Sequence, residues 1–197
     1  MDELRRRILE TSLDLFSKQG FNGTSINEIS ENAEVSEEVI LEYFEGKEDL
    51  LNNLFSLLGP TAVKEEIERL LGEKINQPYE FLRVCVKEVI RELNDERAQK
   101  FLQIMLKEHN LGLIKEQIKN KFIEENQGVI VNIFQKMIEA GLIQKKDPFV
   151  LSRELIGPLL LLRIECLLLG FEDANREDLS RMAEQHLEFF WESIKVA

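Results

Sequence analysis

Four glutamates and one leucine are the most informative group of side chains in this chain. In the segment SEEVILEYFEG, residues 36–46, one flank of a helical wheel carries Glu37, Glu38, Leu41, Glu42 and Glu45. A carboxylate in a DNA groove can accept a hydrogen bond from cytosine N4, and aliphatic side chains can touch thymine methyl groups. The same carboxylates would also suit a basic protein surface.

No catalytic or metal-binding pattern accompanies this group. The two histidines, His109 and His186, fall on different predicted helices without metal-ligand spacing, and no glycine-rich phosphate loop occurs. We therefore expect no enzyme, no metal site and no cofactor. Cys85 and Cys166 lie among apolar residues, which indicates buried reduced thiols rather than a disulfide or a redox switch.

Two helices precede the acidic segment. Apolar residues recur at steps of three and four over residues 3–19, which predicts an amphipathic helix that Gly20 ends. Ser25 and Glu28 have the spacing of a capping box, in which each side chain satisfies a backbone N–H group of the other residue. This pair predicts a short helix over residues 25–33.

The acidic segment itself is the third helix. Ser36 is a good N-cap, and the helix is expected to run to Tyr43 or Phe44 before Gly46 ends it. A fourth helix begins at Lys47. Two short helices joined by a tight turn form a helix-turn-helix, whose second helix can lie in a DNA major groove.

The order and spacing of these fragments resemble a known family. The first helix is followed by Gly-Phe-x-x-Thr-Ser-Ile, then Ile-Ser-x-x-Ala-x-Val-Ser, then Tyr-Phe-x-x-Lys-Glu-Asp-Leu. This succession is similar to the DNA-binding domain of the tetracycline-repressor (TetR) family of bacterial regulators, and the resemblance covers nearly the whole chain. It implies an all-α fold, with a three-helix DNA-binding domain at residues 1–48 and a ligand-binding and dimerisation domain at residues 49–197.

The resemblance also assigns the DNA contacts. Thr24, Ser25, Tyr43 and Lys47 match residues that lie against phosphates in the family. Glu34 stands where the turn between the two helices commonly has glycine. The outward positions of the third helix depart from the family, because acidic or aliphatic residues replace its basic, small or hydroxyl-bearing ones; these positions are Glu37, Glu38, Val39, Leu41 and Glu42.

Negative charge is concentrated in the same region. Residues 1–50 hold five Lys and Arg against thirteen Asp and Glu, a formal charge of −8, whereas the whole chain carries −12. Lys and Arg contacts with phosphates supply most non-specific DNA affinity, and nearby acids oppose it. Arg5, Arg6 and Arg7 either reach the DNA backbone from the first helix or form a solvated cluster.

The last two predicted helices are apolar on more than one side. The segment Leu155–Leu169 is too short for a membrane span and contains Arg163 and Glu165. One apolar stripe holds Leu151, Leu155, Leu159, Leu162, Cys166 and Leu169, and a second holds Ile156, Leu160, Ile164 and Leu167. With a final helix at residues 176–195, this pattern indicates a homodimer through a four-helix bundle, as in the family. The alternative is that both helices complete a monomer core.

The resemblance places an effector pocket among the intervening helices, which we predict over residues 79–93, 97–108 and 113–139. Its candidate walls are Phe81, Cys85, Phe101, Met105, Phe122, Phe134, Met137, Ile156 and Leu160, with Arg163 as a polar anchor. Such walls would suit a lipophilic ligand. Residues of these types at helical spacing also form ordinary core.

Together these observations predict a TetR-like transcriptional regulator that binds operator DNA as a homodimer and leaves it on binding a small lipophilic effector, most simply as a repressor. The alternative is a homologue with weakened or lost DNA binding, whose acidic third helix meets a basic protein partner. Hydrophobic residues make up 44% of the chain and charged residues 31%, and no secretory signal is visible. We therefore expect a cytoplasmic protein without membrane contact.

Overall fold

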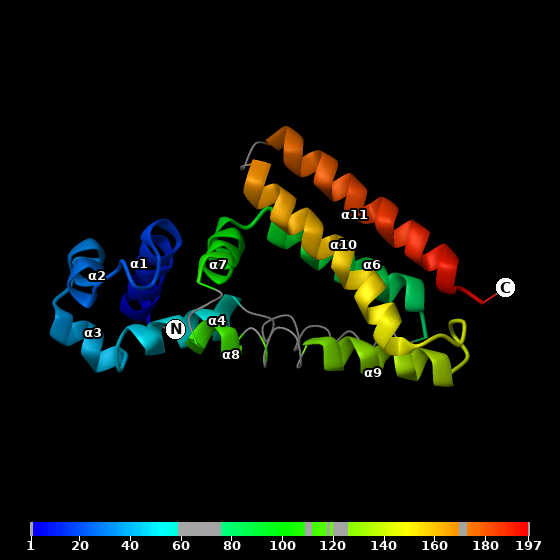
Figure 1. Ribbon diagram of the computed structural model, residues 1–197, viewed down its shortest axis with the longest axis horizontal. Helices are drawn as coiled ribbons and strands as arrows, with labels where there is room; N and C mark the ends of the chain where they lie inside the picture. The colour runs from blue at the N-terminus through cyan, green and yellow to red at the C-terminus, as the bar shows by residue number, and fades with distance from the viewer. Residues whose placement is uncertain are drawn as a thin grey trace. The chain divides into compact units, whose positions relative to one another are not determined.

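The computed structural model describes residues 2–58, 76–108, 112–117, 119, 126–169 and 173–196. Helices are the only regular elements of these residues, apart from an isolated antiparallel bridge between Ile143 and Lys195. The all-α fold expected from the sequence is therefore confirmed (Figure 1). The chain divides into two compact units, which we call the head unit (Met1–Ala62 and Lys100–Phe122) and the C-terminal unit (Val63–Gln99 and Ile123–Ala197).

The head unit contains α1 (Glu3–Gln19), α2 (Ile26–Ala33), α3 (Glu37–Tyr43), α4 (Lys47–Leu58) and α8 (Gly112–Gln117). The first three helices begin where a side-chain oxygen accepts a first-turn N–H group: Asp2 from Leu4, Ser25 from Glu28, and Ser36 from Val39. These caps explain why the boundaries follow from the sequence, since an uncapped helix start leaves its N–H groups without partners.

The core of the head unit is made of apolar side chains from α1 to α4. Its buried members include Ile8, Leu9, Leu13, Phe16, Ile29, Ile40, Phe44, Leu50, Leu54 and Phe55. On α3, Ile40 and Phe44 are inside, as the helical wheel predicts. They hold the helix by its inner side and leave the opposite flank to solvent.

From Lys100 onward, α7 (Glu96–Lys107) packs against α1 and α4. Lys100 Nζ lies 2.7 Å from Asp14 Oδ1, and the ring of Phe101 meets the ring of Phe55 edge-on, with centroids 4.9 Å apart. The boundary expected between residues 48 and 49 remains a prediction. In the structure, α4 and this part of α7 group with the head unit.

The end of α7 also forms hydrogen bonds with the end of α1. Lys107 donates to the carbonyl oxygen of Ser17 at 2.7 Å, and Glu108 accepts the N–H of Phe21 at 3.0 Å. Gly20 makes this contact possible, because its φ is +84° and an added Cβ would lie 2.5 Å from Glu108 Oε1. The last turn of α1 is thereby capped by residues almost 90 positions away.

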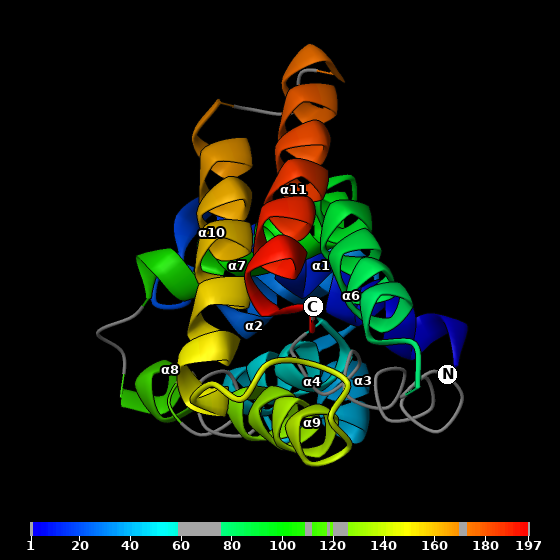
Figure 2. The ribbon, with the colours of Figure 1, turned by 90° about the vertical axis from the view of Figure 1, so that its right-hand side faces the viewer.

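The C-terminal unit is built from α6 (Pro78–Leu93), α9 (Asn126–Glu139), α10 (Pro148–Leu169) and α11 (Asp173–Ile194). Helices α6, α10 and α11 lie side by side, and α9 packs on α10 (Figure 2). The predicted helices at 79–93, 97–108 and 176–195 agree with α6, α7 and α11 within three residues at each end. The predicted helix 113–139 is seen as α8 and α9, and the rest of it, apart from Lys119, lies outside the described residues.

The two predicted stripes of α10 are only partly correct. Most of the first stripe is buried, from Leu151 to Cys166, but Leu169 at the end of the helix is exposed. The second stripe is half-buried, because α10 packs on α6, α9 and α11 at once. The most exposed apolar residues of the helix are Leu168 and Leu169 at its end, followed by Leu161, and neither Leu168 nor Leu161 belongs to a predicted stripe.

Candidate nucleic-acid interface

The turn between α2 and α3 determines how α3 is presented. Glu34 lies in the left-handed region, with φ +55° and ψ +47°, and its N–H is directed at the carbonyl oxygen of Glu31. The N–H of Val35 donates to Ser30 at 3.0 Å. A left-handed conformation is unfavourable for a residue with a Cβ, which explains why glycine is common at this position in the family.

The outward flank of α3 is acidic, as the sequence predicts. Glu37, Glu38, Leu41, Glu42 and Glu45 are all exposed, and 54% of the Leu41 surface is accessible. Val39 is half-buried at the edge of this flank. The carboxylates point neither into the core nor beneath arginines, and Leu41 is the large apolar side chain in their midst.

Glu38 differs from the other glutamates of this flank because its carboxylate turns back toward the start of α3. A hydrogen bond from the Ser36 hydroxyl, and another from the N–H of Glu38 itself, hold the pKa of Glu38 below its usual range. An acid in the first helical turn is also favoured by the helix dipole. Part of the acidity of α3 therefore stabilises the helix itself.

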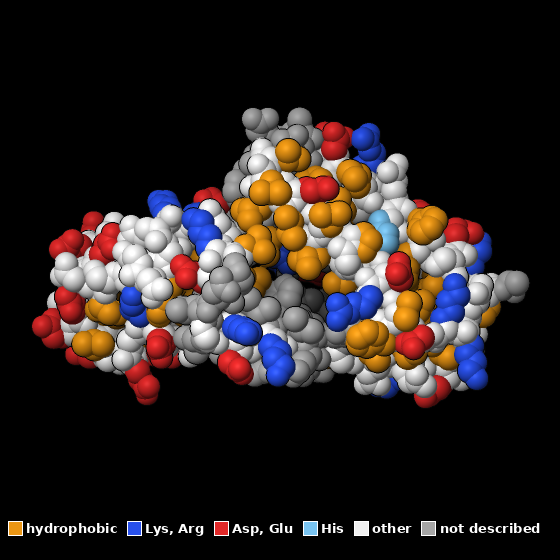
Figure 3. All heavy atoms as spheres, in the orientation of Figure 1, with side chains coloured by type: hydrophobic (Ala, Val, Ile, Leu, Met, Phe, Trp, Pro, Cys, Tyr) orange, Lys and Arg blue, Asp and Glu red, His pale blue; other side chains and the backbone are white. Residues whose placement is uncertain are grey.

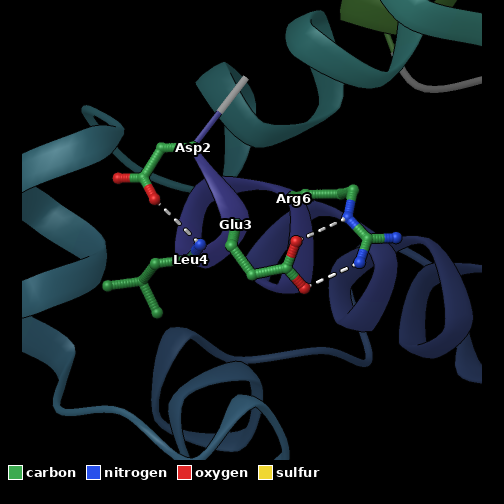
Figure 4. A network of polar contacts seen from close by, with 4 residues as sticks. All are labelled: Asp2, Glu3, Leu4 and Arg6. Atoms are coloured by element: carbon green, nitrogen blue, oxygen red, sulfur yellow. Dashed lines mark hydrogen bonds and ion pairs between the residues drawn. The ribbon is translucent and has the colours of Figure 1, made fainter.

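Tyr43 is tied to the N-terminus of α1. Its hydroxyl donates to Asp2 Oδ2 at 2.6 Å. The other oxygen, Asp2 Oδ1, accepts the N–H of Leu4 at 3.1 Å (Figure 4). The Tyr43 bond lowers the pKa of Asp2 and raises the pKa of Tyr43. The hydroxyl of Tyr43, which we expect to face a DNA phosphate, is therefore already hydrogen-bonded to the Asp2 carboxylate.

The other expected phosphate contacts also have partners inside the head unit. Lys47 Nζ donates to the carbonyl oxygens of Phe21 and Thr24 at 2.7 and 2.5 Å, and lies 4.5 Å from the centroid of the Phe21 ring. The Thr24 hydroxyl is buried and donates to Gly20 at 2.8 Å. Ser25 is exposed, and its hydroxyl caps α2.

The arginines at the start of α1 are partly engaged. Arg5 donates to Asn53 at 2.6 Å and lies over the Phe44 ring. Arg6 pairs with Glu3 at 2.7 Å (Figure 4). Arg7 is exposed. The sequence offered no signal for the Arg5–Asn53 and Tyr43–Asp2 contacts, because more than 40 residues separate the partners of each.

The candidate pocket residues fall into both units. Phe81, Phe134 and Met137 are buried in one apolar cluster of the C-terminal unit, against which Cys85 and Ile156 pack. Burial raises the pKa of Cys85 to about 12, in agreement with an inert thiol.

The remaining candidates are not all gathered there. Leu160 and Arg163 are half-buried on α10, whereas Phe101 and Met105 are buried in the head unit. Phe122 lies outside the described residues. Within the described residues, no helix is long and apolar enough to cross a membrane, and no three potential metal ligands are grouped.

The chain is similar to named bacterial regulators. It is 26% identical over 146 residues to the uncharacterized HTH-type transcriptional regulator YuxN of Bacillus subtilis (strain 168), covering 71% of this chain and 48% of that protein. It is 24% identical over 164 residues to the HTH-type transcriptional regulator AcrR of Shigella flexneri, covering 79% of this chain and 76% of AcrR. The chain thus spans about half the length of YuxN.

The fold has close counterparts among solved structures. A triclosan complex of SmeT, the repressor of the Stenotrophomonas maltophilia multidrug efflux pump SmeDEF, superposes with a TM-score of 0.82 at 20% identity, covering 99% of this chain and 93% of SmeT. The family model described as bacterial regulatory proteins, tetR family, matches residues 8–54, which include the helix-turn-helix of α2 and α3. The helix-turn-helix of this chain therefore matches the DNA-binding segment of the tetR family of bacterial regulatory proteins, and the chain is similar over most of its length to transcriptional regulators.

Proposed function

We propose that this protein is a homodimeric repressor that binds operator DNA through α3 and leaves it when a small lipophilic effector binds. The observation that carries the proposal is the presentation of α3: Ile40 and Phe44 hold its inner side, while the opposite flank is open to solvent. A recognition helix needs this arrangement to enter a major groove. Such a regulator would act in the cytoplasm, where the bacterial chromosome lies.

Exposed apolar residues on α10 and α11 support a dimer. Leu161 and Leu168 on α10, and Met182 and Phe189 on α11, are between 46% and 78% exposed. Figure 3 shows hydrophobic side chains gathered over α10 and along α11. An apolar surface of this kind usually marks a protein contact, and a two-fold axis would bury it against its own copy.

The apolar cluster of the C-terminal unit supports a lipophilic effector. Phe81, Phe134 and Met137 come from α6 and α9 and would offer an apolar ligand aromatic and thioether contacts. SmeT, whose fold this chain shares, was solved with triclosan. An effector can release DNA only if it binds one conformation of the protein better than the other.

We propose that α7 carries the signal from the effector to α3. This helix begins with residues of the C-terminal unit and ends against α1, where Lys107 and Glu108 hold the carbonyl of Ser17 and the N–H of Phe21. A shift of α7 would therefore move α1 and the helices packed on it. Coupling of this kind requires that α7 has different positions with and without the ligand.

The acidic flank of α3 affects the strength of DNA binding more than the function. Glutamates near phosphates weaken binding and give no counterion release. The alternative function, a basic protein partner for this flank, is not favoured, since the family match includes α3 and the similar proteins are named as transcriptional regulators. We infer that the protein binds operator DNA with modest affinity.

Selection from a randomised DNA library at about 50 mM salt tests the proposal. We expect enrichment of a pseudo-palindromic site, which the Leu41→Asp variant does not bind, because a further carboxylate then faces the groove. Glu139→Asp on α9 is the matched control and should bind as the wild type does. Triclosan is the first probe for release of the enriched DNA. Failure of any sequence to be enriched would contradict operator binding.

A further inference from the structure

The side-chain hydrogen-bond donors of α3 are already engaged. Tyr43 carries the only side-chain donor within Glu37–Tyr43, all of which the structure describes, and its hydroxyl is bonded to Asp2. Just before the helix, the Ser36 hydroxyl is hydrogen-bonded to the carboxylate of Glu38. Just after it, Lys47 directs its ammonium group to two backbone carbonyls. The helix therefore approaches a ligand without a free side-chain donor.

The groups that α3 does present are acceptors and methyl groups. Leu41 lies at the centre of the outward flank with 54% of its surface exposed. Glu37 and Glu42 are exposed on either side of it in the sequence, and Glu45 follows one turn later. An aliphatic side chain between carboxylates can recognise only an apolar group that has hydrogen-bond donors beside it.

Base pairs differ in which of these groups they display in the major groove. Guanine shows two acceptors, N7 and O6, which require a donor from the protein. Cytosine shows the N4 amino group, adenine shows the N6 amino group beside N7, and thymine shows its C5 methyl group. A carboxylate facing guanine N7 and O6 would be repelled, whereas it can accept a hydrogen bond from either amino group.

We propose that α3 reads its half-site through thymine methyl groups, contacted by Leu41, and through cytosine or adenine amino groups, contacted by Glu42 and its neighbours. It makes no hydrogen bond to guanine N7 or O6. This inference rests on the proposed operator binding and names the chemistry of the bases that the operator must contain. It makes Leu41 the central specificity-determining residue.

Single-atom changes in the enriched DNA test the inference. Uracil in place of each thymine removes one methyl group, and we expect at least one such change per half-site to weaken binding about fourfold, the effect of one buried methyl group. Leu41→Ala should abolish this sensitivity. Leu57→Ala, on α4, makes the same change at an exposed leucine and should retain it. If uracil has no effect at any position, the methyl contact is wrong.

7-Deazaguanine in place of each guanine removes N7, and we expect binding to change less than twofold. A tenfold loss with the wild-type protein would overturn the inference while leaving operator binding intact. Enrichment of no sequence would overturn both.

The carboxylate contact has its own test. Glu42→Gln introduces an amide that pairs with adenine N6 and N7 together, so repeating the selection should shift one position of each half-site to adenine. Glu139→Gln, with the same loss of charge on α9, should select the wild-type site. If Glu42→Gln changes neither the identity of the selected bases nor the strength of any preference, Glu42 makes no base contact.

Discussion

Helices α3 and α11 each contain a pair of consecutive apolar residues, one of which is buried while the other is exposed to solvent. Ile40 is fully buried and Leu41 is 54% exposed, while Phe190 is 3% exposed and Phe189 is 76% exposed. In both helices the buried member belongs to a core. The exposed members have different surroundings, because Leu41 lies among glutamates whereas Phe189 lies on the helix pair that also exposes Leu161 and Leu168.

This difference indicates what each surface binds. An isolated apolar group among charges can contact a polar, hydrated partner such as a DNA groove, where it recognises single methyl groups. Several apolar groups together are stable only when a second apolar surface excludes water from them. The two exposed side chains thus predict a wet interface for α3 and a dry one for α10 and α11.

The largest effect on stability is expected from replacing Phe190, the buried residue of the pair on α11. Phe190→Ala should lower the free energy of unfolding by about 3–5 kcal/mol, since it removes an aromatic ring and leaves a cavity. Phe189→Ala should affect only the part of the stability that depends on protein concentration. Thermal unfolding over a range of concentrations measures both, and equal losses at every concentration would show that Phe189 belongs to the core.

A negative charge in place of Phe189, the exposed residue of the pair on α11, should break the dimer interface that we expect at α10 and α11. Phe189→Glu forfeits about 1.5–3 kcal/mol of burial, and a two-fold axis doubles the loss. We therefore expect the dimer dissociation constant to rise at least about 100-fold. Sedimentation equilibrium measures this change, with Leu41→Glu as the control that leaves the dimer intact. A dimer that tolerates Phe189→Glu would place the contact elsewhere.

The turn that presents α3 should accept glycine with a gain in stability. Glu34→Gly relieves the left-handed backbone of a residue with a Cβ, so we expect the free energy of unfolding to rise by about 1 kcal/mol. Glu31→Gly, in α2, should lower it by about the same amount, because glycine is unfavourable inside a helix. Urea denaturation of both variants checks the sign, and a loss with Glu34→Gly would contradict the strain.

The smallest effect concerns the bond between Asp2 and Tyr43. Asp2→Asn should lower the pKa of Tyr43 toward its usual value, since the Asp2 carboxylate raises it. Because the folded-state pKa of Asp2 is lowered, its contribution to stability is present above the unfolded-state pKa and is lost as the pH falls through the folded-state value.

Ultraviolet titration can separate the two tyrosines of the chain, Tyr43 and Tyr79. Tyr79 is hydrogen-bonded to Glu188, which raises its pKa. Glu188→Gln should therefore shift only Tyr79, and Asp2→Asn only Tyr43. An unchanged titration with Asp2→Asn would show that the phenol is free to meet a phosphate.

Local features of the fold could be predicted from the sequence with little error. The starts of α2 and α3 follow from Ser25 and Ser36, because a capping side chain acts within three residues of its own position. The burial of Ile40 and Phe44 follows from helical periodicity in the same way. The acidic outward flank of α3 therefore follows from the sequence alone.

Contacts between distant residues had no such local signal. The hydrogen bonds of Lys107 and Glu108 to the end of α1 join residues that are 90 and 87 positions apart. The engagement of Tyr43 by Asp2 likewise depends on how α1 and α3 pack. The sequence shows which groups α3 carries, but not which of them are already hydrogen-bonded within the protein.

The sequence by itself determined the helices, their caps and the side of α3 that faces solvent, because these depend on steps of a few residues along one chain segment. Only the tertiary structure decided that the donors around α3 are engaged and that Leu161, Leu168 and Phe189 remain uncovered. Packing selects one neighbour among many residues that periodicity treats alike, and this selection is set by the whole fold.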